Sequence, residues 1–64
     1  MARFEQDKVT IYSIEKYAGM WNPEGLEYYD KQEALEELEF HRKLYPQEKW
    51  RLTSRQATVV WRRE

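Results

Sequence analysis

The hydrophobic positions early in the chain predict that its first regular element is a β-strand, although they do not alternate cleanly with polar ones. Residues 8–17 are rich in β-branched and aromatic side chains, which favour extended structure. Val9 and Ile11 lie on one side of such a strand, whereas Tyr12 and Ile14 lie on the other. The pattern therefore predicts either that both faces are partly covered or that a bulge changes the register midway.

Residues that favour turns follow this strand, and they are Gly19, Asn22, Pro23 and Gly25. We expect a turn or loop here that contains Met20 and Trp21. The next four residues, 26–29, predict a short return strand that closes a hairpin with the first strand.

A capped helix is the clearest local signal in the sequence. Asp30 is a strong N-cap residue, and Glu33 follows at the spacing of a capping box. The helix is expected from Lys31 to Leu44 or Tyr45, because Pro46 cannot continue it. At 100° per residue one face should pack on the core, and it consists of Ala34, Leu35, Leu38, His41, Arg42 and Tyr45.

Two apolar residues of this helix, Phe40 and Leu44, lie well away from the expected core face. One interpretation is that a chain terminus or the loop with Trp21 covers them. The other is a second apolar stripe that docks a partner or a second copy of the chain.

The C-terminal part predicts two further strands. Residues 49–55 alternate, with Trp50 and Leu52 on one face and the arginines on the other. Residues 56–57 are expected to form a tight connection to a partner strand at 58–63. The sequence thus predicts an α+β fold of order β(β)αββ, an antiparallel sheet of three or four strands with one helix packed on one face. We expect residues 1–64 to form a single domain, with residues 1–7 as a flexible lead-in.

Composition limits how this fold is stabilised. The 64 residues include no cysteine, so neither disulfides nor thiolate metal sites are expected. Three tryptophans, five tyrosines and two phenylalanines argue against disorder, although 36% of the residues are charged. With a Met-Ala start and no targeting signal or long apolar run, we expect a complete gene product that is soluble and cytoplasmic.

Charge is segregated along the chain. Residues 24–39 contain seven acidic residues and one lysine, whereas residues 40–64 contain seven basic and two acidic residues. The helix N-terminus accounts for much of the acidic half, because the helix dipole favours anions there. Two opposed electrostatic regions on a small protein favour docking over catalysis.

Candidate chemistry is sparse, and we expect neither catalytic residues nor a cofactor. The one histidine would have to activate Ser13 or Ser54, and neither lies on a turn typical of a nucleophile. Glu33, Glu37 and His41 could line one side of the helix and bind a divalent cation. A solvated helix face with a Glu37–His41 contact is the preferred interpretation, so no metal site is expected.

The basic C-terminal residues leave three interpretations open. The arginines could lie over apolar surface and pair with Glu5, Glu15 or Glu27. They could instead hold phosphates while a tryptophan stacks on a base, although the overall net charge of −1 disfavours nucleic acid. They could also dock on a protein, which is the preferred functional interpretation.

The layout resembles that of small accessory proteins of bacteriophages and prophages. A strand, then Tyr28-Tyr29-Asp30 opening the Glu33-Ala34-Leu35 helix, then the Trp50-Arg51-Leu52 strand, is similar in outline to the small early inhibitors with which lytic phages bind a host RNA polymerase. The resemblance covers the layout of residues 8–63. It implies a stoichiometric binder that takes part in host takeover or anti-defence by blocking a host polymerase, nuclease or defence complex.

The sequence thus predicts a non-enzymatic interaction module that inhibits or modulates a larger host protein. We expect Arg51, Arg55, Trp61 and Arg62 to bind the partner from the sheet, with Trp21 and Phe40 as apolar anchors. The alternative is a small nucleic-acid-binding protein that uses the C-terminal hairpin. A homodimer through Phe40 and Leu44, or through the edge strand 58–63, is compatible with either function.

Overall fold

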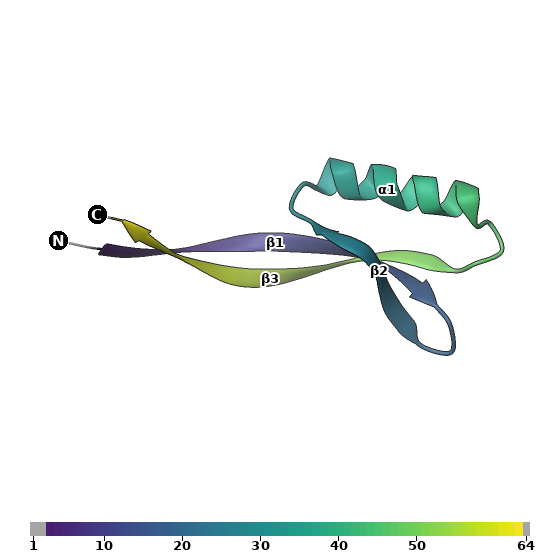
Figure 1. Cartoon of the computed structure of the whole chain (residues 1–64), viewed down its shortest axis with the longest axis horizontal. Coiled ribbons are helices and arrows are strands. Elements are labelled where there is room, and N and C mark those ends of the chain that lie inside the picture. Colours follow the sequence, from purple (N-terminus) through teal and green to yellow (C-terminus); the bar gives the residue numbers. More distant parts are fainter. Residues whose placement is uncertain (1–2, 64) are drawn as a thin grey trace.

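The predicted α+β class is confirmed by a computed structural model that describes residues 3–63 and, within them, the side chains of residues 6–60. An antiparallel sheet of strand order β2-β1-β3 carries one helix on one of its faces (Figure 1). The elements are β1 (Arg3–Tyr17), β2 (Trp21–Tyr28), α1 (Lys31–Leu44) and β3 (Trp50–Arg63).

The predicted hairpin between the first two strands is present, with a shorter turn and a longer return strand than expected. Tyr17 pairs with Trp21, and the Ala18 N–H donates to the Met20 carbonyl at 2.8 Å. Gly19 has a φ of 79°, a conformation that glycine adopts without strain. Trp21 therefore begins β2 rather than lying in a loop.

A bulge interrupts the pairing of β1 with β2. Ser13 pairs with Glu27 and Glu15 pairs with Pro23. Between these two pairs β2 therefore advances four residues, whereas β1 advances two. Gly25 lies inside this step with a φ of 80°. Of the two alternatives for the first strand, partial cover of both faces is confirmed, because Ile11 and Ile14 lie on opposite faces of β1 and are both buried. A bulge within the first strand is wrong, because the extra residues lie in β2 and β1 pairs with its other neighbour without a register shift.

The predicted C-terminal hairpin is wrong. β3 is one continuous strand that pairs with β1 from Trp50 opposite Lys16 to Arg63 opposite Arg3, without a shift of register. The physical reason is that Gln56 and Ala57 have no preference for a turn, which glycine, proline, asparagine or aspartate would supply. Over the described residues the sheet has three strands, and the order of elements along the chain is ββαβ.

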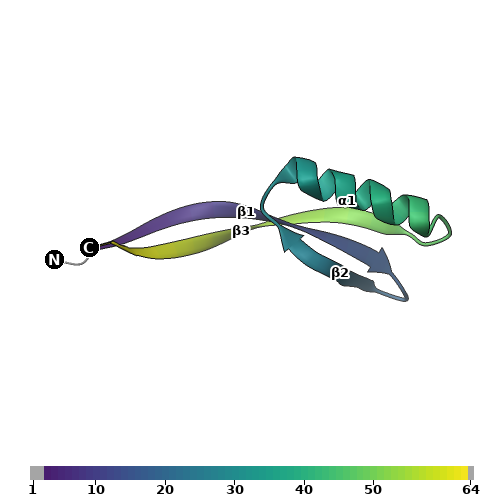
Figure 2. The ribbon, with the colours of Figure 1, turned by 45° about the horizontal axis from the view of Figure 1, so that its top comes forward.

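A long two-stranded ribbon projects from the body of the protein. β1 begins at Arg3, five residues before its expected start, so residues 3–10 pair with residues 56–63 beyond the reach of α1 and β2 (Figures 1 and 2). The molecule measures 56 × 23 × 13 Å. Its radius of gyration is 15.6 Å, against about 11 Å for a compact chain of this length. We call residues 3–10 and 56–63 the ribbon.

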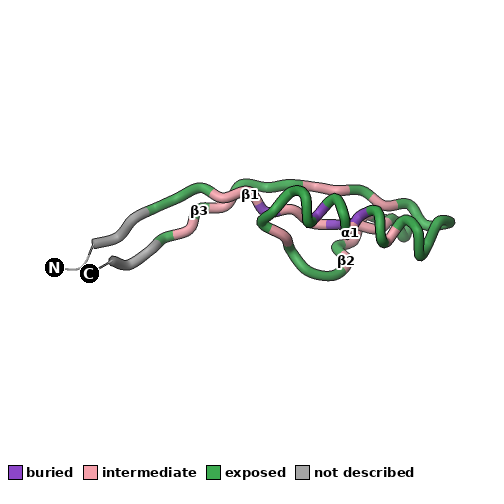
Figure 3. The backbone as a smooth tube through the Cα atoms, turned by 90° about the horizontal axis from the view of Figure 1, so that it is seen from above, coloured by how far each residue is buried: buried purple, intermediate pink, exposed green. Residues whose placement is uncertain are grey.

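The core is small and lies between α1 and the sheet. Ala34 and Leu38 are the buried residues of the helix, and Ile14 is fully buried on the strand below it. Figure 3 shows that the buried segments gather where α1 covers the sheet, whereas the described part of the ribbon is exposed or half-buried. The helix side of the sheet also includes Leu52, which is the partner of Ile14 in register.

The helix begins at its predicted N-cap. The Asp30 carboxylate accepts a hydrogen bond from the Gln32 N–H at 3.1 Å, and α1 ends at Leu44 as expected. Replacing Asp30 with alanine is expected to lower the free energy of unfolding by roughly 0.5–2 kcal/mol, because a helical N–H loses its acceptor. Urea unfolding would measure this loss. Asp30→Asn keeps an acceptor and is expected to recover most of it, and an unchanged Asp30→Ala variant would contradict the assignment.

Candidate interaction surface

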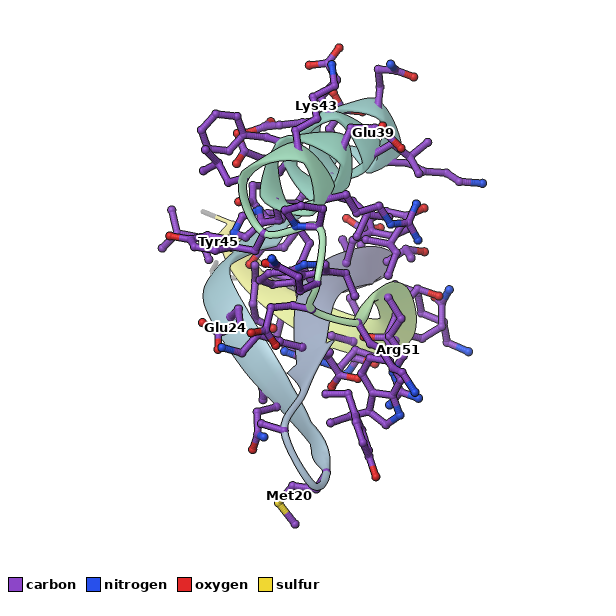
Figure 4. The ribbon with its side chains drawn as sticks, turned by 90° about the vertical axis from the view of Figure 1, so that its right-hand side faces the viewer. Met20, Glu24, Glu39, Lys43, Tyr45 and Arg51 are labelled. Atoms are coloured by element: carbon purple, nitrogen blue, oxygen red, sulfur yellow. The ribbon has the colours of Figure 1, made fainter. Side chains whose placement is uncertain are left out.

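Among the described residues, no helix or strand covers the face of the sheet opposite α1, and we call it the open face. Trp50 lies on the helix side, since its ring centroid is 4.9 Å from that of His41 in α1. Side chains alternate along a strand, so Arg51 and Arg55 lie on the other side, as predicted. In the end-on view of Figure 4, Arg51 lies beyond the sheet from the helix, while Glu39 and Lys43 project from the outer surface of the helix.

One residue from each strand contributes to a cluster at the end of this open face. The Tyr17 and Trp21 ring centroids are 5.3 Å apart, and the Arg51 guanidinium lies 4.3 Å from the centroid of the Trp21 ring. The Lys49 ammonium stands 5.7 Å from the centroid of the Tyr17 ring. We call Tyr17, Trp21 and Arg51 the arginine–aromatic cluster.

A carboxylate fixes the arginine of this cluster. Glu15 is the neighbour of Arg51 in register, and its Oε1 accepts from Arg51 Nε at 2.7 Å and lies 2.6 Å from Nη2. The Glu15 side chain is 17% exposed and that of Arg51 is 46% exposed. The guanidinium is therefore held on the Trp21 ring and still faces solvent.

The second arginine of the open face spans the central strand. Arg55 on β3 forms an ion pair with Glu27 on β2, and β1 lies between these two strands. Ile11 is the register neighbour of Arg55, so this ion pair passes beside it and explains why Ile11 is buried on a face that lacks a helix. For Arg51 and Arg55 the expected pairing with Glu15 and Glu27 is confirmed, and the charge of these two arginines is locally compensated. The third expected partner, Glu5, lies outside the described side chains.

The structure brings together three of the six predicted binding residues. Trp21, Arg51 and Arg55 share the open face. Trp61 and Arg62 lie near the far end of β3, about 33 Å along the strand from Arg51 at 3.3 Å per residue, and their side chains are outside the described part.

The sixth predicted residue, Phe40, lies on the helix and is separate from the open face. Phe40 and Leu44 are 55% and 54% exposed, so neither the hairpin with Trp21 nor the described residues near the termini cover them. Phe40 borders a shallow depression on α1 that Leu35, Glu36 and Lys43 also line. For the described part of the chain, the interpretation that another segment covers these two residues is therefore wrong.

Sequence reasoning missed Tyr17 and Lys49 as members of this surface. A signal was available for Tyr17, because it and Trp21 flank a three-residue turn and therefore pair across it. No comparable local signal indicated Lys49, whose carbonyl accepts a hydrogen bond from the Tyr17 N–H at 3.0 Å across the sheet.

In the row of Glu33, Glu37 and His41 on α1, the histidine ring contacts the helix backbone. His41 Nδ1 donates to the Glu37 carbonyl at 2.7 Å. Among the described residues, no group of three or more potential ligands is placed to hold a metal ion.

Burial raises the pKa of the Tyr28 phenol, and the Glu37 and Glu33 carboxylates raise that pKa further, so Tyr28 stays neutral at physiological pH.

Comparison with known proteins does not place the chain in a family. No family model, curated protein or solved structure matches it. In the part of the chain that the structure describes, no helix has the length and apolar character needed to cross a lipid bilayer.

Proposed function

We propose that the protein is a non-enzymatic interaction module that binds a larger protein stoichiometrically and inhibits or modulates it. The arginine–aromatic cluster carries this proposal. Tryptophan, tyrosine and arginine are the residues that most often dominate the binding energy of protein interfaces. Here one of each lies at the exposed end of a rigid sheet, where Tyr17 is 41% exposed.

The cluster is already organised for binding. An exposed arginine normally loses rotamer freedom when a partner fixes it, and this loss opposes association. Glu15 and Trp21 already restrict Arg51, so a partner gains its hydrogen bonds at a smaller entropic cost. The described contacts engage Nε and Nη2, which leaves the Nη1 donors to a carboxylate or carbonyl of the partner.

The resemblance to small bacteriophage accessory proteins supports a bacterial host protein as the partner. In this proposal the module acts in the host cytoplasm, where it occupies a surface that a polymerase, nuclease or defence complex needs. Inhibition then follows from occupancy alone and requires no chemistry by the module.

Affinity capture from a bacterial lysate tests the proposal. The tagged protein is expected to retain one partner in a fixed molar ratio, and Arg51→Met is expected to lose it, because methionine keeps an apolar stem but not the guanidinium. Arg42→Met is the matched control, since Arg42 pairs with Glu39 at 3.6 Å on the helix surface. No stoichiometric partner, or equal capture by the Arg51 and Arg42 variants, would contradict the proposal.

A second candidate function is binding of nucleic acid through the ribbon. A two-stranded antiparallel ribbon fits the major groove of DNA, and the sequence places Arg62 and Arg63 on this one. Against it, the net charge of the chain is −1, whereas domains that bind nucleic acid are usually strongly basic. A mobility shift of duplex DNA at low salt, lost steeply as salt is added, would support this second function.

A further inference from the structure

The two outer edges of the sheet differ in their capacity to accept another strand. The β2 edge is eight residues long and is interrupted by Pro23 and by the bulge at Gly25. β3 has 14 residues, contains neither proline nor glycine, and pairs with β1 without a register shift. Proline and bulges are common protections of an edge strand, and β3 has neither.

The free edge of β3 is long and regular. Within the described residues β3 has a neighbouring strand only on its β1 side, so its other side presents alternating N–H and C=O groups. Fourteen residues at 3.3 Å each make an edge of about 46 Å. The free stretch of β1 in the ribbon is shorter, and it carries the acidic residues Glu5 and Asp7.

The positive charge of β3 favours pairing of its free edge with an acidic strand over pairing with a basic one. β3 contains four arginines, Arg51, Arg55, Arg62 and Arg63, and no acidic residue. A second copy of β3 would bring like charges together, which opposes pairing of the strand with itself. An incoming strand with acidic side chains would instead lie beside the arginines, sharing Arg51 with Glu15 and Arg55 with Glu27.

We propose that the free edge of β3 binds an extended acidic segment of the partner protein as a fourth strand of the sheet. The inference rests on the proposed function and names the partner's recognised element. Backbone hydrogen bonds supply a ladder along β3, and carboxylates beside the arginines supply selectivity. Nucleic acid fits this edge less well, because phosphate oxygens accept from the N–H groups but donate nothing to the carbonyls.

A pair of substitutions separates the β3 edge from the rest of the ribbon. Val60 on β3 is 56% exposed, and its register neighbour on β1 is Gln6. Val60→Glu is expected to weaken binding of the acidic segment roughly five-fold through like-charge repulsion between paired strands. Gln6→Glu makes the same addition of negative charge at the same height of the ribbon but on the other strand, and it is expected to have a smaller effect.

Two synthetic peptides of about ten residues serve as probes in nuclear magnetic resonance titrations, one alternating valine with glutamate and the other valine with lysine. The glutamate peptide is expected to shift the β3 amide signals and to protect every second β3 amide from hydrogen exchange. Val60→Glu is expected to reduce both effects, and the lysine peptide to produce neither.

Several outcomes would overturn the inference. These are no shift with the glutamate peptide, equal binding of the two peptides, shifts confined to the arginine–aromatic cluster, or stronger perturbation of the β3 edge by duplex DNA. A dimer in light scattering whose outward β3 amides are protected from hydrogen exchange without any peptide would also overturn it. If Arg51→Met abolishes capture of the partner while Val60→Glu changes neither capture nor peptide binding, the proposed function stands and strand addition is wrong.

Discussion

Replacing Ile14 with alanine is expected to reduce the free energy of unfolding by about 2–5 kcal/mol, the range found when large aliphatic side chains are removed from a core. Ile14 is fully buried under α1, and the other buried hydrophobic residues of the described part are Ile11, Ala34 and Leu38. At roughly 0.05–0.15 kcal/mol per residue, a chain of this size has little stability to lose. A large fraction of the variant is therefore expected to be unfolded at 25 °C.

Urea unfolding followed by tryptophan fluorescence and far-ultraviolet circular dichroism measures this effect. Leu26→Ala is the matched control, because it removes an aliphatic side chain of the same size from the exposed surface of β2. Its expected change is within about 0.5 kcal/mol. Equal losses in the two variants would show that α1 is not held to the sheet through Ile14.

Replacing Trp21 with alanine is expected to weaken binding of the partner at least about 30-fold, which corresponds to 2 kcal/mol or more for a residue at the centre of an interface. The substitution removes the surface on which the Arg51 guanidinium rests, 4.3 Å from the ring centroid, and the ring that pairs with Tyr17. Arg51 then regains rotamer freedom that binding must again restrict.

Titration calorimetry with the captured partner measures this loss. Trp21→Phe keeps an aromatic face and is expected to retain most of the affinity, while Tyr29→Ala removes an exposed aromatic ring outside the cluster and should leave binding nearly unchanged. Unfolding curves establish that each variant is folded. Equal losses in Trp21→Ala and Tyr29→Ala would place the interface elsewhere.

The residues near each end of α1 were enough to predict where the helix begins and ends, but nearby residues did not predict the length of β3. The two ends of α1 are set by neighbouring residues: Asp30 caps its N-terminus, and Pro46 prevents its continuation. Both effects act within a few residues. The extent of β3 depends on a distant segment, because Gln56 and Ala57 stay extended opposite Thr10 and Val9. Sheet pairing of this kind is non-local, so a strand that continues cannot be told from two strands by its own residues alone.

The ion pairs of the candidate site could be predicted from the sequence, but which side chains meet in the arginine–aromatic cluster could not. Alternation around Trp50 placed Arg51 and Arg55 together, and the nearby acids suggested their partners. Trp21 joins Arg51 only because β2 starts earlier than its turn residues suggested. Phe40 is separate because a helix turns 100° per residue, which places it opposite the buried Leu38.

The pairing of Arg3 with Arg63 also has a consequence for synthesis on the ribosome. Of the three described strands, β1 emerges first and is the central strand of the sheet, whereas its longest partner, β3, emerges last. Until residues 50–63 are translated, β1 can form its hairpin with β2 but remains unpaired along the ribbon. The sheet therefore completes after translation of β3, and nascent chains stalled before Trp50 are expected to expose Ile11 and Ile14 to chaperones.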